Sequence, residues 1–117
     1  MSNSKNWLVL ISGDADAKNS AVKAGIDLAL AAGVFGQNVK LVFAGKGIKL
    51  LGPEPGDNPE LHKLIGAAPF YDIKEVHAFA TTPVPSGETY RKDLPITHLS
   101  QSDWHIATAE ADVVINY

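Results

Sequence analysis

Eight residues at or near the ends of apolar runs have side chains or backbone groups suited to binding or catalysis. They are Ser12, Gly13, Asp14, Gly45, Gly47, His77, Thr81 and Thr82. Backbone amides at a helix start can bind a small ligand, and two glycines around a lysine can cradle an anion. A histidine near a cleft can act as an acid or a base. The two threonines are well placed for substrate contact.

Each of these patterns also has a structural interpretation. Ser12 to Asp16 can form a turn and a helix cap, and its two aspartates would repel a phosphate group. Gly45 and Gly47 can supply a tight turn that needs positive φ. His77 can be a packed, hydrogen-bonded histidine of a strand. From the residues alone, both interpretations stay open.

Several kinds of catalytic and metal chemistry lack their residues in this chain. The absence of cysteine excludes disulfides, thiolate metal sites and thiol nucleophiles. The four histidines do not have the spacing of a helical zinc motif, so we expect no metal site. There is no GxSxG turn, and a threonine nucleophile would need a base that the sequence does not identify. We therefore expect no enzymatic activity and no cofactor.

Length, charge and hydropathy limit the class of protein. A chain of 117 residues favours a single domain over 1–117, with enough core to fold alone. The net charge is -3 and the basic residues are scattered, so direct nucleic-acid binding is not expected. The polar start and the lack of any run of about 20 apolar residues argue against a membrane anchor. The sequence thus predicts a cytoplasmic protein.

The hydrophobic pattern alternates between strand-like and helix-like segments. Apolar runs predict strands at residues 7–11, 39–44, 76–80, 94–99 and 113–117. Caps and apolar stripes predict helices from Asp16 or Ser20 to Gly33, from Asn58 to Pro69, and from Ser102 to Glu110, with one further turn at 88–92. Pro95 favours an edge position for the fourth strand. This order predicts an α/β fold with a mostly parallel sheet and helices on both faces.

Three stretches of the chain resemble the DsrE/DsrF family of sulfur-relay proteins, and in particular its DsrF and TusC subunits. They are residues 43–51, residues 64–66 followed by 70–73, and residues 111–117. They are similar to the family segments A-x-G-[IV]-x-x-L-L, L-Y-D-I and Y-D-V-I-x-x-F, in the same order. The resemblance implies a three-layer α/β/α domain with a five-stranded sheet, assembled with homologous subunits, commonly as a heterohexamer.

In that family a cysteine at the end of the third strand can carry sulfur as a persulfide toward tRNA thiolation or sulfur oxidation. Counting back from Gly87 places this position at Phe79 in our chain. A phenyl ring cannot accept sulfur, because the thiolate is the nucleophile. The resemblance therefore implies a non-catalytic subunit with a structural or partner-binding role.

Three hypotheses follow. The first is this cysteine-less subunit, in a trimer or hexamer. Four apolar residues would contact the neighbouring chains unless they belong to the core: Ile48, Leu50, Leu51 and Phe70. The second is a small-ligand-binding homo-oligomer with a pocket touching Ser12, Gly13, Gly47 and Thr81. The third is a homo-oligomer with an unrelated enzyme activity that uses His77 or Asp14.

Overall fold

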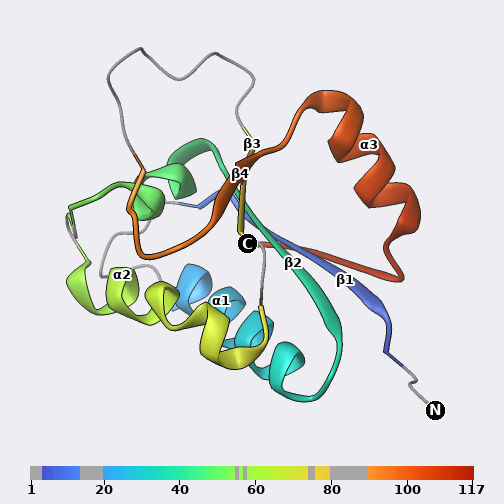
Figure 1. The fold of residues 1–117 in the computed structure, drawn as a ribbon, viewed down its shortest axis with the longest axis horizontal. Coiled ribbons are helices and arrows are strands. Elements are labelled where there is room, and N and C mark those ends of the chain that lie inside the picture. Colours follow the sequence, from blue (N-terminus) through green and yellow to red (C-terminus); the bar gives the residue numbers. More distant parts are fainter. Residues whose placement is uncertain (1–3, 14–19, 55, 57, 74–75, 80–89) are drawn as a thin grey trace.

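The computed structural model shows an α/β fold built on one five-stranded, all-parallel sheet (Figure 1). It describes all residues except 1–3, 14–19, 55, 57, 74–75 and 80–89. The strands are β1 (Asn6–Ile11), β2 (Asn38–Ala44), β3 (Val76–Phe79), β4 (Ile96–His98) and β5 (Val113–Asn116). The helices are α1 (Ser20–Val34), α2 (Pro59–Gly66) and α3 (Gln101–Glu110), with two 3-10 helices, η1 (Gly45–Leu51) and η2 (Ala68–Tyr71). The predicted fold class is confirmed.

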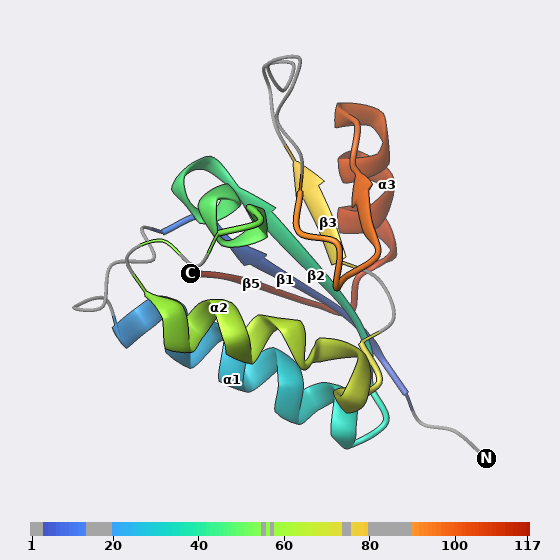
Figure 2. The same ribbon diagram turned by 60° about the vertical axis from the view of Figure 1, so that its left-hand side comes forward.

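The strand order is β4-β3-β2-β1-β5, which puts β4 at an edge as Pro95 indicated. The chain steps outward from β1 to β4 and then returns across the whole sheet to β5. Connections between parallel strands are right-handed. A connection that runs one way along the sheet therefore lies on one face, and a connection that runs the other way lies on the opposite face. Accordingly α1, η1, α2 and η2 cover one face, and of the described helices α3 alone lies over the other (Figure 2).

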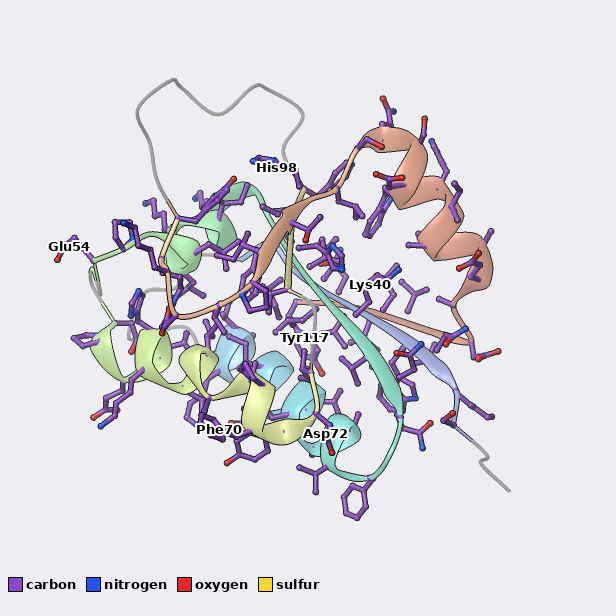
Figure 3. All side chains as sticks on the ribbon, viewed as in Figure 1. Lys40, Glu54, Phe70, Asp72, His98 and Tyr117 are labelled. Atoms are coloured by element: carbon purple, nitrogen blue, oxygen red, sulfur yellow. The ribbon has the colours of Figure 1, made fainter. Side chains whose placement is uncertain are left out.

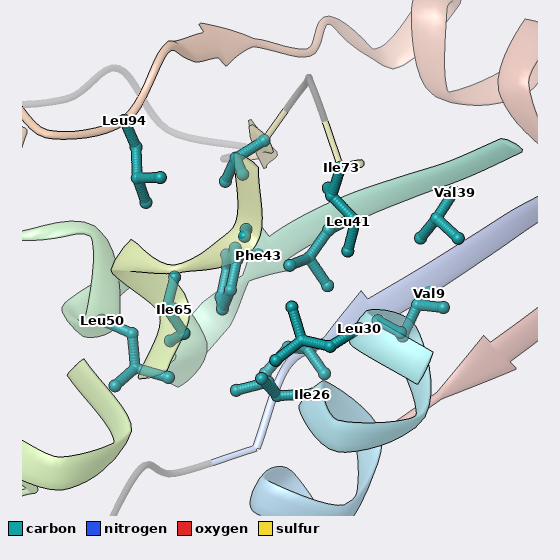
Figure 4. Close-up of a cluster of buried hydrophobic side chains, with 14 of the residues drawn as sticks. Val9, Ile26, Leu30, Val39, Leu41, Phe43, Leu50, Ile65, Ile73 and Leu94 are labelled. Atoms are coloured by element: carbon teal, nitrogen blue, oxygen red, sulfur yellow. The ribbon is translucent and has the colours of Figure 1, made fainter. Parts of the chain in front are cut away.

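The main core lies between the sheet and α1, η1 and α2 (Figure 4). Side chains alternate along each strand, so Val9 and Ile11 face this layer and Leu8 faces α3. The predicted apolar stripe of α1 is confirmed, because Val22 and Ile26 are fully buried. Since both faces of the central strands are covered, their sequences read as continuous apolar runs.

The core on the α3 face is much smaller. Its buried members are Leu8, Val42, Leu99 and Ala107. Half-buried side chains complete it, among them Phe79 from β3 and Trp104 from α3. One helix thus covers a face that spans five strands.

Two glycines allow the chain to turn sharply from β2 into η1. Gly45 has a φ of 53°, in the left-handed region that glycine adopts without strain. Gly47 is buried against the carbonyl oxygen of Ile11, where a Cβ atom would overlap that oxygen. The predicted tight turn is confirmed, and η1 contains both the two glycines and the apolar patch that follows them.

Several element boundaries differ from the prediction. The cap of α3 is Ser100 and not Ser102: Ser100 Oγ accepts from the amide of Asp103 at 3.0 Å, and Asp103 bonds back to the amide of Ser100. Helix α2 ends at Gly66, before Pro69, which falls inside η2. Residues 90–92 are not helical. No helix in the described ranges is long and apolar enough to cross a bilayer.

We predict that Gly47→Ala lowers the free energy of unfolding by about 1–3 kcal/mol, the usual cost of overpacking. The added Cβ would push η1 away from the end of β1. Urea denaturation of the purified variant measures the loss. The neighbouring exposed variant Lys46→Ala is the control and should change stability by no more than about 0.5 kcal/mol. Equal stability of the two variants would contradict the close approach.

Candidate functional site

The carboxyl ends of β1 and β2 bring four of the predicted site residues together. Ser12 and Gly13 follow β1, while Gly45 and Gly47 lie in the turn after β2. The glycines approach the backbone of the β1 end, since a Cβ on Gly45 would lie 3.5 Å from the oxygen of Ser12. The other predicted members, Asp14, Thr81 and Thr82, lie outside the described residues.

The amides at the end of β1 are already used within the chain. The amides of Ser12 and Gly13 donate to the carbonyl oxygen of Tyr117 at 2.8 and 3.0 Å. The Ser12 hydroxyl donates to Asn116 Oδ1 at 3.1 Å. These are the donors that a ligand would need. Within the described residues, this region therefore joins β1 to the end of β5. The helix cap predicted for this stretch lies outside them.

His77 lies apart from these loops. It is an inner residue of β3, 6% exposed, and pairs in register with Val42 and Thr97. This register places its side chain on the α3 face of the sheet. The pKa of Asp103 at the start of α3 is below its usual value, chiefly through hydrogen bonds with Ser100, with smaller contributions from His77 and Lys40. The structure thus associates His77 with the start of α3 and not with Ser12 and Gly13.

Phe79 is the last residue of β3, at the position where the resemblance places a persulfide thiol. Its ring stacks on that of Trp104, with centroids 5.1 Å apart and planes inclined by 10°. Both rings belong to the small core of the α3 face. This position therefore carries a packing contact that fixes the first half of α3 to the sheet.

We predict that Phe79→Ala and Trp104→Ala each lower the free energy of unfolding. Because both rings are half-buried, each loss should be smaller than the about 3–5 kcal/mol measured for fully buried aromatic residues. A double-mutant cycle should give a coupling energy of about 0.5–1.5 kcal/mol, because the rings stack directly. Chemical denaturation of the four proteins measures it. Ile106→Ala on the exposed side of α3 is the control and should not couple to Phe79. Strict additivity of Phe79→Ala and Trp104→Ala would contradict the stacking contact.

A buried arginine is an element of the structure that the sequence analysis missed. Arg91 Nε and Nη2 donate to the two carboxylate oxygens of Asp93 at 2.6 and 2.7 Å. Its Nη1 donates to the carbonyl oxygens of His62 and Leu50 at 2.7 and 3.2 Å. Arg91 thus connects α2 and η1 to the segment before β4. Its spacing in the sequence carries no signal of this role.

The Arg91 guanidinium lowers the pKa of the Asp93 carboxyl below its usual 3.8, mainly through the side-chain hydrogen bond. A carboxyl with a lowered folded-state pKa stabilises the fold above about pH 4, and this contribution is lost as the pH falls through the folded-state pKa. We predict that Asp93→Asn costs about 1 kcal/mol or less at pH 7, because the carboxylate is 53% exposed and screened by solvent.

The same variant, measured by urea denaturation between pH 7 and pH 2.5, should converge on the wild-type protein at the acid end. The control is Asp27→Asn, whose partner Lys23 forms an exposed pair on α1. A constant difference between Asp93→Asn and wild type across this range would show that the Arg91–Asp93 pair does not contribute through its charge.

The four predicted interface residues fall into two groups. Leu50 and Leu51 are buried in the main core and Ile48 is half-buried against it. Phe70 is 88% exposed and points away from the fold (Figure 3). Only Phe70 is therefore fully available to a partner.

Sequence analysis missed two further exposed apolar residues near Phe70. Val34 and Phe35, at the end of α1, are 55% and 80% exposed. Gly33 contacts the carbonyl oxygen of Tyr71, so the end of α1 lies against η2. We call Val34, Phe35 and Phe70 the α1/η2 patch. The sequence does indicate this patch. Val34 and Phe35 are apolar residues directly before a glycine, at a point where the apolar stripe of α1 that faces the core is already complete.

Over the described ranges, no cluster of three potential metal-binding side chains occurs. Neither a protein-family model nor a curated protein matches the chain.

Proposed function

We propose that this chain is a non-catalytic, cysteine-less subunit that binds related chains in an oligomer of the sulfur-relay type. The observation that carries the proposal is the stacking of Phe79 on Trp104 at the end of the third strand. A carrier subunit needs a reactive thiolate there, and this chain has an aromatic packing contact instead. Its contribution to such a complex would then be its surface.

The α1/η2 patch supports a partner-binding role. Large exposed apolar side chains on neighbouring elements mark interaction surfaces more often than isolated ones do. Burying one phenylalanine side chain contributes about 1.5–3 kcal/mol. Phe35 and Phe70 are 80% and 88% exposed, so nearly all of that free energy is available to association.

The sulfur-relay context is supported by the three motifs of the sequence resemblance. Their residues fall on the β2–η1 turn, on α2 and η2, and on β5. The second motif includes Phe70 of the α1/η2 patch. We infer that the partners are chains of the same fold, in a trimer or hexamer serving tRNA 2-thiolation or sulfur oxidation.

Native mass spectrometry after co-expression with the products of neighbouring genes tests this proposal. We predict a mixed oligomer for the wild-type chain. The double variant Phe35→Ser/Phe70→Ser should be recovered as a folded monomer, because it removes the apolar contact area and no core residue. The control is Ile106→Ser, which removes a 56% exposed apolar side chain from α3, on the other face of the sheet.

Two outcomes would contradict the proposal. One is a wild-type chain that stays monomeric with every neighbouring product. The other is a double variant that assembles as well as the Ile106→Ser control, which would place the interface elsewhere.

A further inference from the structure

A pocket lies between α3 and the first residues of β1 and β2. The residues that matter to its chemistry are Asn6, Leu8, Lys40, Ala107, Glu110 and Ala111. Its cavity volume is about 90 Å³ and it is partly open to solvent. This is well below the about 300–1,000 Å³ of typical ligand sites, so only a small molecule fits there. It is at the opposite end of the sheet from Ser12 and Gly13, and none of the residues proposed from the sequence lines it.

The shape of the pocket follows from the sequence of α3. Trp104 fills the space at the start of the helix by stacking on Phe79. One and two turns later the inward positions are occupied by Ala107 and Ala111, whose side chains are too small to fill the same gap. The far end of the helix is held by Asn6, whose Nδ2 donates to the carbonyl oxygen of Glu110 at 3.2 Å. The helix is thus fixed at both ends over a space that its own side chains leave open.

Lys40 brings a positive charge into this space. It pairs in register with Leu8, so its side chain is on the α3 face, and Figure 3 shows it between the sheet and α3. It is half-buried. Within the described part of the chain, Lys40 makes no hydrogen bond or ion pair. Its charge acts on the Asp103 carboxyl, whose pKa it helps to lower. A half-buried lysine without an ion pair is suited to bind an anionic group.

The other rim of the pocket is negative. Glu110 is the last residue of α3, and the last turn of this helix contains no basic residue. The carbonyl groups at a helix C-terminus carry a partial negative charge that favours cations. In α3 the carbonyl oxygen of Glu110 already accepts from Asn6 Nδ2. The pocket is therefore lined by one cationic and one anionic side chain, by the amide groups of Asn6 and Asn38, and by an apolar part that includes Leu8 and the two alanines.

We propose that this pocket binds a small zwitterion with an apolar side chain, of the aliphatic α-amino acid class. Its carboxylate would pair with Lys40, and its ammonium group with Glu110 and the C-terminal end of α3. Its hydrocarbon part would lie on Leu8, Ala107 and Ala111. This site is independent of the subunit role proposed above, because the α1/η2 patch is on the other face of the sheet.

The test is an NMR titration of the 15N-labelled chain with leucine, isovalerate and isoamylamine. All three contain the isobutyl group. Leucine carries both charges, isovalerate only the negative one and isoamylamine only the positive one. Leucine should give saturable shifts centred on Leu8, Lys40, Ala107 and Ala111. Each analogue should bind about tenfold more weakly, which is the effect of one charge-assisted hydrogen bond.

Two variants separate the charged contacts. Lys40→Gln should weaken leucine about tenfold and leave isoamylamine unchanged, and Glu110→Gln should weaken leucine and leave isovalerate unchanged. The controls are Lys49→Gln and Glu54→Gln, which remove the same charges from exposed positions outside the pocket. The amide spectrum of each variant reports that the fold is intact.

Three results would overturn the proposal. They are the absence of saturable shifts up to the solubility of leucine, leucine shifts that map to another part of the chain, and a Lys40→Gln variant that binds leucine as the wild type does. Isovalerate binding as tight as leucine binding would also reject a zwitterion site.

Discussion

The order of the strands imposes one constraint on the whole molecule. Because β5 lies beyond β1 while β4 lies at the far edge, a single connection must cross the complete sheet, and α3 is its only helix. A ten-residue helix covers little of a five-stranded face. The chain therefore has to fix α3 at its ends, with Trp104 on Phe79 at the start and Asn6 hydrogen-bonded to Glu110 at the finish. The thin α3 face and the pocket beneath it both result from this arrangement.

This constraint gives the end of β3 a structural task. A side chain there is close to the start of the crossing helix, and a large ring can hold that helix in place where a small thiol would leave a gap. Phe79 and Trp104 are then best understood as a pair, since both rings are half-buried and each stacks on the other. Phe79 would thus have two consequences. It attaches α3 to the sheet, and it accounts for the loss of sulfur chemistry proposed for this position.

The sequence was sufficient to predict elements whose patterns are local. Continuous apolar runs predicted the strands, and the Asn58-Pro59 cap predicted the start of α2, which the bond from the Leu61 amide to Asn58 Oδ1 confirms. The cap of α3 was misplaced because Ser100 and Ser102 are both capping residues. Only Ser100 has an acidic partner three positions later, and that criterion would have selected it. Leu50 and Leu51 could not be assigned to core or surface, because a 3-10 helix has no apolar period that distinguishes its faces.

The residues that the sequence did not reveal are those whose surroundings come from distant segments. Arg91 is buried by carbonyl groups contributed by η1 and α2, and Lys40 is an ordinary strand lysine until α3 passes over it. The α1/η2 patch likewise depends on Gly33 allowing η2 to approach the end of α1. Because this patch and the Lys40 pocket lie on opposite faces of a rigid sheet, a partner chain on the first leaves the second open. Any coupling between them would have to pass through the sheet, whose central strands are packed on both sides and have little freedom to move.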